Sequence, residues 1–415
     1  MIGLLITAGF LIAFVGATFA YFSMTEAVPA DGGEISEGVF GTPSTLNPLY
    51  ANNNPIDKDL SSLLYPQLFV YDSEGELQPE LVQEYTSNPE KTSYRLTLKE
   101  NIAWDDNTPI TADDVIFTIE KIKDPTLESP LRPALSGVEV AKIDARTIEL
   151  TLGASYSPFI STMNFGILPK HIWENQPVSS YQSLEDNLNT VGAGPFTYRS
   201  HKLGSDSQLT TLSLEKNPGY FGQIPRVDRF SVNFYDNPQE LITDFENGVV
   251  DSASYITLDE ESDNVQTQLV KVPQYFAVFF NTKNAFLKNK PAREALTLAF
   301  NKDLFIEEIV GDFGERLDGP LTQYNTFFRP NEYEYNPERA REILDNDGWT
   351  DVDGDGIREK DNVRAEITLT AAEGDYVPEF LQRFQAAARE IGISVLTERQ
   401  TLVSIQENEL PNRSF

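Results

Sequence analysis

Two hydrophobic periodicities alternate along this chain, and their alternation limits the fold more than any other feature of the sequence. Stretches with a period of two, typical of strands with one buried face, occur at 94–98, 147–152, 211–215, 229–234 and 365–370. Between them lie stretches with a period near 3.6, which is typical of amphipathic helices. Because strands and helices interleave from about residue 35 onward, the sequence predicts an α/β protein.

Several helix boundaries are marked by local residue chemistry. Thr111 is a good N-cap, and Asp114 three residues later completes a pattern close to a capping box. Asn237 followed by Pro238 predicts a second helix start, with Gly248 as its stop. Further helices are expected over 291–300, 337–344 and about 378–390. With 415 residues the chain is too long for one ordinary domain, and the likeliest boundary lies at 256–273.

Charge and cysteine content exclude several classes of function. The chain has 64 acidic and 32 basic residues, a net charge of −32. Such a charge repels phosphate backbones and anionic lipid, so we expect neither nucleic acid nor a lipid surface as a partner. The absence of cysteine excludes disulfides, thiolate nucleophiles, zinc–thiolate sites and lipobox acylation.

The N-terminal stretch predicts export from the cytoplasm. Residues 2–22 are apolar or small, and the first charged residue is Glu26. About 20 such residues span a bilayer core as a helix. We therefore expect residues 1–24 to form a signal anchor or a signal peptide, with Thr18-Phe19-Ala20 as a candidate cleavage pattern. An anchor is favoured because the stretch is long and lacks a basic start, and we also expect residues to precede Met1.

Catalytic motifs are absent from the sequence. Only His171 and His201 could serve as imidazole bases, and both have ordinary structural interpretations as a capping or packing residue and a strand-end residue. Neither a nucleophile elbow, a His-Glu-x-x-His zinc motif nor a phosphate-binding glycine loop occurs. We therefore expect a protein that is not an enzyme and that holds no cofactor or metal, although a pair of carboxylates working as a glycosidase is not excluded by sequence.

One acidic loop has two interpretations. Asp351, Asp353 and Asp355 followed by Gly356 copy the first half of a calcium-binding loop. Position 12 of that loop is Asn362 and not the bidentate glutamate of the motif. The glycines also suit a tight turn before the strand at 365–370, so a structural turn is favoured and a calcium site stays open.

Eight stretches in fixed order carry a resemblance to a known family. The most specific is 102–117, IAWDDNTPITADDVIF, which is similar to a signature of the form W-x-D-G-x-P-[IV]-T-A-x-D-V. It departs from that form at Asn107, which replaces the turn glycine but tolerates positive φ. The other stretches are 41–50, 63–72, 191–196, 217–221, 279–282, 292–296 and 348–349. Together they resemble the family 5 extracellular solute-binding proteins, which bind oligopeptides, dipeptides or nickel for ABC importers.

This resemblance covers about residues 35–400 and implies a periplasmic-binding-protein type II-like fold of two α/β lobes joined by a hinge, with an extra subdomain. It places 35–50 and 170–260 in lobe I, 51–169 in the inserted subdomain and 270–415 in lobe II. Members of the family usually continue beyond the point matching Phe415. We therefore expect the chain to lack a C-terminal part of lobe II, including the acidic residue that pairs with a peptide amine in relatives.

The resemblance also suggests which residues line the ligand cleft. Side-chain amides of Asn47 and Asn52 could hydrogen-bond a ligand backbone, although turn formation is the alternative. Close backbone approach is expected at Gly194 and Phe196, with plain packing as the alternative. The remaining candidates are the residues that enter lobe II, Tyr275, Phe279 and Asn281, of which Phe279 could equally be a core residue.

The resulting hypothesis is an extracytoplasmic, monomeric solute-binding subunit of an ABC importer. It would enclose short peptides and present them to a membrane permease. Alternatives that the sequence leaves open are a nickel chelate, haem or oligosaccharide as the ligand, a surface sensor or adhesion module without transport, and an acidic cell-surface hydrolase.

Overall fold

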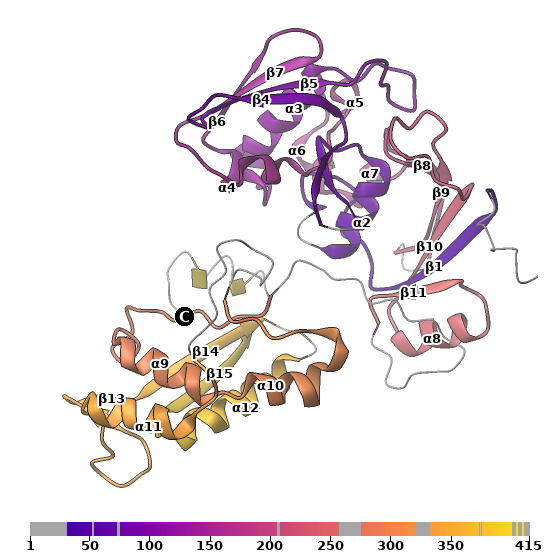
Figure 1. Cartoon of the computed structure of the whole chain (residues 1–415). Coiled ribbons are helices and arrows are strands. Elements are labelled where there is room, and N and C mark those ends of the chain that lie inside the picture. The colour runs from indigo at the N-terminus through magenta and orange to yellow at the C-terminus, as the bar shows by residue number, and fades with distance from the viewer. Residues whose placement is uncertain are drawn as a thin grey trace, which may run out of the picture. The chain divides into compact units, whose positions relative to one another are not determined.

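The computed structural model describes residues 31–51, 54–72, 75–205, 208–256, 275–319, 333–372, 374, 376–400, 404–405 and 409–410 (Figure 1). The chain divides between Glu260 and Glu261 into two compact units, here called unit 1 and unit 2. The N-terminal stretch 1–24 lies outside the described residues. Among the helices of the described ranges, none combines the length and apolar character needed to cross a membrane.

The first sheet of unit 1 has five strands in the order β11-β1-β10-β9-β8. Its parallel part consists of β1 with β10 on one side and β11 on the other, and β10, β9 and β8 are antiparallel. Helix α8 connects β10 to β11 and packs on β1, where a Cβ at Gly38 would lie 2.2 Å from Leu241 Cδ1. Glycine at this position therefore lets the helix approach the sheet. The bounds are β1 Glu34–Phe40, β8 Phe196–Leu203, β9 Leu209–Lys216, β10 Arg229–Tyr235, α8 Pro238–Glu246 and β11 Ser252–Ser254.

The second sheet of unit 1 is antiparallel with the order β4-β5-β7-β6, and helix α3 packs against it. Residues Val115, Ile119 and Ile122 form the buried face of α3 at the helical period. A short ribbon of β2 and β3 lies before this sheet in the sequence. The bounds are β2 Phe69–Tyr71, β3 Leu77–Pro79, β4 Val82–Ser87, β5 Ser93–Leu98, α3 Ala112–Lys123, β6 Val138–Lys142 and β7 Thr147–Leu152.

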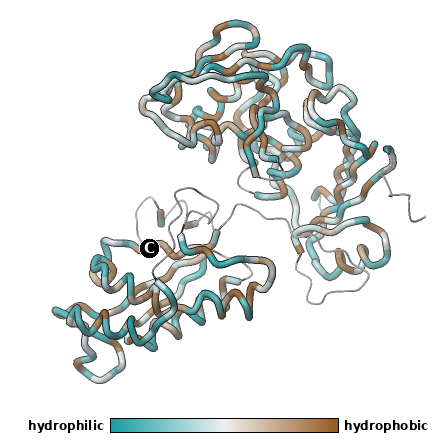
Figure 2. Tube along the Cα trace, in the orientation of Figure 1, coloured by the Kyte–Doolittle hydropathy of each residue, from teal (hydrophilic) through white to brown (hydrophobic). Residues whose placement is uncertain are grey.

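Short helices complete unit 1, and a single hydrophobic core joins its parts. The helices are α2 Pro55–Leu64, η2 Pro125–Leu127, α4 Arg132–Leu135, η3 Phe159–Met163, α5 Lys170–Trp173, α6 Val178–Gln182 and α7 Leu184–Asn187. The core runs from Val39 on β1 to Leu150 on β7 and includes Trp104, so both sheets share it. Figure 2 shows the apolar residues of this unit alternating with hydrophilic ones along strands and helices.

Unit 2 packs helices around a two-stranded parallel sheet of β14 and β15. In its core, Phe380 contacts the rings of Phe300, Phe305 and Phe384 at centroid distances of 5.3–5.8 Å. Phe380 also contacts the ring of the exposed Phe276 at 4.7 Å. The bounds are α9 Lys290–Ala299, α10 Lys302–Phe305, η4 Ile306–Val310, η5 Gly311–Phe313, α11 Pro337–Asn346, β12 Glu359–Lys360, β13 Val363–Arg364, β14 Glu366–Ala372, α12 Val377–Glu390 and β15 Ser394–Gln400.

The elements predicted from periodicity and caps are confirmed, with boundaries shifted by a few residues at most. Thr111 caps α3 in a complete capping box with Asp114, and Asn237 caps α8. Asn107 takes the expected left-handed conformation, with φ of 69°. The predicted caps and turn agree with the structure because each depends on the side chains of a few neighbouring residues.

Candidate functional site

Three parallel strands of unit 1 end at the same edge of the sheet. The register places Val39 beside Phe234 of β10 and beside Ser254 of β11. In α/β sheets, ligands bind outside the carboxyl ends of the parallel strands, where loops leave the sheet. The loops after β1, β10 and β11 are therefore the candidate ligand-binding edge of unit 1.

Side chains from the first turn of α2 hold the loop that follows β1. Asn54 caps α2 by accepting a hydrogen bond from the Ile56 amide (2.9 Å), and its Nδ2 donates to the Thr42 carbonyl (3.2 Å). Asp57 in the same turn accepts a hydrogen bond from the Ser44 amide at its Oδ1 (2.8 Å). The loop is thus bound to the start of α2 at two points.

The carboxyl group of Asp57 lies in an unfavourable place for a charge. The side chain is 1% exposed, and its Oδ2 has no hydrogen-bond partner among the described residues. Burial raises the pKa of Asp57 to about 6, against smaller opposing effects of the backbone amides of Ser44 and Thr45. Its protonation state therefore changes between mildly acidic and neutral pH.

A second set of polar contacts fixes the end of β11 at the same edge. Ser254 donates a hydrogen bond to Glu37 of β1, and Tyr255 donates one to Asp59 of α2 (2.5 Å). Burial raises the pKa of Glu37, which the Ser254 bond opposes. Tyr255 has a φ of 60°, which is rare for a residue with a bulky side chain, and its side chain is half-exposed. Strained backbone of this kind clusters at ligand clamps and switch regions.

Of the residues predicted for the ligand site in unit 1, those that the structure describes are buried. The Asn47 side chain accepts a hydrogen bond from the Leu49 amide (3.0 Å), and its Nδ2 has no partner within the described ranges. Asn52 lies outside the described residues. Gly194 donates to the Leu64 carbonyl (2.9 Å), and a Cβ there would lie 2.4 Å from Leu63 O, so close backbone approach is present, but toward α2. Phe196 is 7% exposed and packs against Phe230. Ligand contact by these residues stays a prediction.

The predicted residues of unit 2 lie on an apolar segment that is neither helix nor strand and has exposed aromatic side chains. Tyr275 is 52% and Phe279 is 72% exposed, whereas Val278 and Phe280 pack against the core. No backbone hydrogen bond joins residues 275–280 to another residue within the described ranges. Asn281 ends the segment, and its Oδ1 accepts a hydrogen bond from the Lys283 amide (3.0 Å). Their role in ligand binding also stays a prediction.

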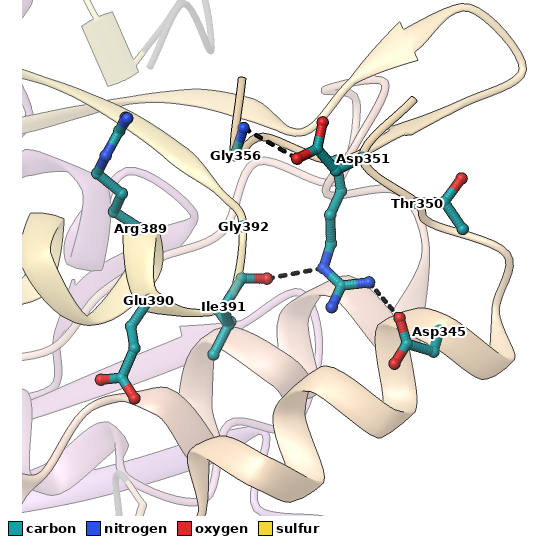
Figure 3. A pocket seen from close by; sticks show the side chains of 9 residues that line it. Asp345, Thr350, Asp351, Gly356, Arg389, Glu390, Ile391 and Gly392 are labelled. Carbon is teal, nitrogen blue, oxygen red and sulfur yellow. Dashed lines mark hydrogen bonds and ion pairs between the residues drawn. The ribbon is translucent and has the colours of Figure 1, made fainter. Parts of the chain in front are cut away.

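Each unit has a hollow among its described residues. In unit 1 a cavity of about 90 Å³ is bordered by Pro48 and Ala51 from the loop after β1 and by Lys58 and Asp59 of α2. In unit 2 an open pocket of about 420 Å³ lies around Arg358 (Figure 3). The Arg358 guanidinium donates to the carbonyls of Ile391 (2.9 Å) and Trp349 (2.7 Å) and pairs with Asp345. Its donors therefore join segments of unit 2, which is a structural role.

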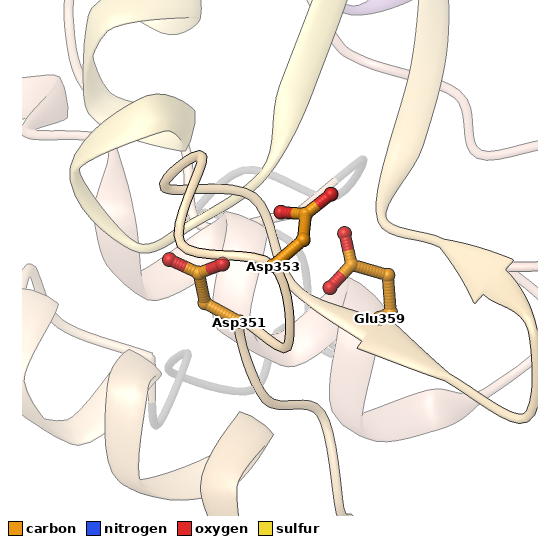
Figure 4. Close-up of side chains that lie close together, drawn as sticks. All are labelled: Asp351, Asp353 and Glu359. Carbon is orange, nitrogen blue, oxygen red and sulfur yellow. The ribbon is translucent and has the colours of Figure 1, made fainter.

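The acidic loop of unit 2 brings three carboxylates together. Oxygen atoms of Asp351, Asp353 and Glu359 lie within 4.8 Å of one another (Figure 4). Asp351 also accepts hydrogen bonds from the amides of Gly354 (2.8 Å) and Gly356 (3.0 Å), which close the turn. Asp355, predicted from the motif as a ligand, pairs instead with Arg364 (2.5 Å), and this contact lowers the Asp355 pKa. The structure thus shows a stabilised turn and leaves the calcium interpretation open.

The two histidines make separate side-chain contacts. His171 pairs with Asp106 (2.7 Å), and His201 hydrogen-bonds the Tyr198 hydroxyl (2.7 Å). Each histidine is thus engaged by one side chain in a different part of unit 1. Among the described residues, neither contact forms the triad of nucleophile, histidine base and orienting carboxylate that is typical of acyl transfer.

Sequence reasoning did not single out Glu37, Asp57, Asp59 or Tyr255. A signal for Asp57 was available, since Asn54-Pro55 followed by Asp57 has the pattern of a helix start. That pattern does not show which backbone the carboxylate will contact. Their grouping depends on strand order, which no local pattern specifies.

The fold is that of the type II periplasmic binding proteins. The structure is similar to NikZ from Campylobacter jejuni in complex with Ni(L-His), with a TM-score of 0.71 and 23% identity over 91% of this chain and 75% of that chain. It is also similar to the oligopeptide-binding protein AppA from Bacillus subtilis in complex with a nonapeptide, with a TM-score of 0.67 and 24% identity over 92% of this chain and 78% of that chain. These likenesses establish the fold.

The sequence identifies the family within this class. Residues 76–411 match the bacterial extracellular solute-binding proteins, family 5, and the chain belongs to that family. Among curated relatives it is 27% identical to the oligopeptide-binding protein AppA of Bacillus subtilis, over 95% of this chain and 74% of the relative. It is 23% identical to the nickel-binding periplasmic protein of Escherichia coli, over 88% and 71%. Family members are extracytoplasmic solute-binding components of ABC importers for peptides or nickel, and they are not enzymes.

Proposed function

We propose that this chain is the extracytoplasmic receptor subunit of an ABC importer, that its ligands are short peptides, and that it encloses them in an interlobe cleft and presents them to the permease. The N-terminal stretch 1–24 would anchor it to the membrane or direct its export, which its continuous apolar character supports. It would act as a monomer. The resemblance to the AppA proteins supports a peptide ligand.

The domain assignment belongs to the same proposal. Lobe I would comprise 35–50 and 170–260, the inserted subdomain 51–169, and lobe II 270–415. This division is supported by the sheets, because β1 pairs with strands from 229–254, whereas β4 to β7 lie wholly within 82–152. A chain that enters lobe I, leaves it and returns would produce such a pattern.

The observation that carries the peptide proposal is the segment 275–280. Its backbone amides and carbonyls have no partners among the described residues, and its aromatic side chains are exposed. An extended peptide can pair with such a backbone as an added strand. Main-chain pairing gives affinity without requiring a particular peptide sequence, while Tyr275 and Phe279 would contact peptide side chains.

Isothermal titration calorimetry on the full chain tests this proposal. A pool of peptides of four to nine residues should bind, and peptides with N-methylated backbone amides should bind at least tenfold more weakly because they cannot pair. Phe279→Ala should lower the affinity about tenfold. Phe313→Ala removes another exposed aromatic side chain of unit 2 and should leave the peptide affinity unchanged. Heat from a nickel chelate or mannohexaose with none from peptides would overturn the peptide assignment.

A further inference from the structure

The loop after β1 lies at the carboxyl ends of the parallel strands, and one buried carboxyl group holds its backbone. Asp57 Oδ1 accepts the hydrogen bond of the Ser44 amide at 2.8 Å, and the Thr45 amide also approaches this carboxyl group. Asp57 is 1% and Thr45 is 4% exposed, whereas Ser44 is exposed, so it is the accepting carboxyl group that is shielded from water. The Asp57 contacts therefore restrict where this part of the loop can lie.

The remainder of the loop is built on these contacts. The Thr45 hydroxyl accepts a hydrogen bond from the Asn47 amide (3.1 Å), and Asn47 in turn accepts one from Leu49. Pro48 and Ala51 then border the 90 Å³ cavity beside α2. A shift of Ser44 and Thr45 would consequently be passed along a chain of short-range bonds to the surface that borders this cavity.

We propose that Asp57 is a positioning residue for the ligand, since its hold on Ser44 and Thr45 fixes the loop at the carboxyl end of β1 against which the ligand binds. This inference rests on the proposed function, with the added premise that the ligand contacts the carboxyl ends of the parallel strands of unit 1. Asp57 itself would not touch the ligand, because it is buried beneath the loop.

The geometry also makes the loop sensitive to pH. Residues 41–51 contain no charged side chain, and Tyr50 donates its hydroxyl to the Leu127 carbonyl (2.7 Å). The nearest charged neighbours along α2 are Lys58 and Asp59, which are exposed, and Glu37 on β1 is bonded to Ser254. Ionised Asp57 thus has backbone amides as its partners and leaves Oδ2 without one among the described residues.

The direction of this pH dependence follows from the difference in the Asp57 pKa between the closed and the open loop. Opening of the loop would hydrate Asp57 and return its pKa from about 6 toward the ordinary value of 3.8. The closed loop binds the proton more tightly than the open loop, so closure is favoured at low pH. This advantage is complete below pH 4 and is lost as pH rises through 6.

Hydrogen exchange in the ligand-free full chain tests the positioning role. After correction for the chemical exchange rate, protection of the Ser44 and Thr45 amides should fall by about 10- to 100-fold between pH 4.5 and 7.5. Asp57→Asn keeps an oxygen acceptor and removes the titratable carboxyl group. The protection of the Ser44 and Thr45 amides in this variant should therefore be independent of pH. The matched control is Asp114→Asn, a buried aspartate at the same position of α3 that holds the Lys170 amide (3.0 Å), and it should keep the wild-type profile at Ser44.

Binding of N-acetylated, C-amidated tetra-alanine at the same two pH values adds a functional measurement, because this peptide has no ionisable group. Wild-type affinity should fall by up to about tenfold from pH 4.5 to 7.5, whereas Asp57→Asn affinity should stay constant. A wild-type exchange profile retained in Asp57→Asn, or a flat profile in the wild type, would overturn the role of Asp57. Absence of binding by the wild type at both pH values would instead count against the proposed function, because the exchange measurement needs no ligand.

Discussion

The starts of helices α2 and α3 are nearly the same in local structure and differ in what their aspartates contact. Each has a polar N-cap, Asn54 or Thr111, and a buried aspartate three residues later. Asp114 uses both oxygens, accepting from the amides of Thr111 (2.8 Å) and Lys170 (3.0 Å). Asp57 binds the loop after β1 through Oδ1 and leaves Oδ2 without a described partner. The same helix-start pattern thus gives one fully bonded carboxylate and one that is poorly stabilised as an anion.

The largest effect is expected where the bonded carboxylate is removed. Asp114→Ala leaves the part-buried amides of Thr111 and Lys170 without their acceptor. The free energy of unfolding should fall by about 2–4 kcal/mol, since hydrogen bonds to charged groups are worth more than neutral ones. Urea denaturation measures this value. A loss below about 1 kcal/mol would show that the two helix starts are not distinguished by their contacts.

Asp57→Asn should change the free energy of unfolding in the opposite direction and raise it at high pH. Wild-type Asp57 must carry a charge in a buried place above pH 6, because burial raises its pKa to about 6. Its stabilising contribution is therefore present at low pH and lost as pH rises. The variant should be more stable than the wild type by about 1–3 kcal/mol at pH 8 and equal to it near pH 4, by urea denaturation at both values. Equal differences at the two pH values would contradict the raised pKa.

Removal of either N-cap should lower the free energy of unfolding by a similar amount. Thr111→Ala deletes the hydroxyl that caps α3, and Asn54→Ala deletes the amide that caps α2 and also binds the Thr42 carbonyl. Each should lower the free energy of unfolding by about 1 kcal/mol. If Asn54→Ala costs clearly more, the Thr42 contact contributes to loop stability. Thermal unfolding of both variants in one buffer makes this comparison, with Ser62→Ala on the exposed side of α2 as the control.

The smallest effect is expected for the exposed carboxylates of unit 2. The Asp351 carboxylate already accepts two hydrogen bonds from its own turn, and Asp355 is paired with Arg364. Adding 1 mM calcium should therefore change the melting temperature by less than about 1 °C. A rise of several degrees that Asp353→Asn abolishes would establish the calcium interpretation of this loop.

Sequence patterns predicted the elements of this fold well because these depend on neighbouring residues. The period-two stretches became β5, β7, β9, β10 and β14, and Thr111 with Asp114 formed the capping box that their spacing indicates. The order β11-β1-β10-β9-β8 was not readable in the same way, because β1 pairs with strands about 195 and 215 residues later. Pairing over such separations depends on the whole core.

By itself, the sequence determined an acidic α/β chain without catalytic motifs, and its motifs were sufficient to indicate the family. Only the tertiary structure decided that Asp57 lies beneath the Ser44 amide, that Tyr255 reaches Asp59, and that residues 275–280 have an unpaired backbone among the described residues. The physical reason is that a helix cap acts over three or four residues of one chain segment, whereas the charge state of a buried carboxyl group depends on every segment that excludes water from it.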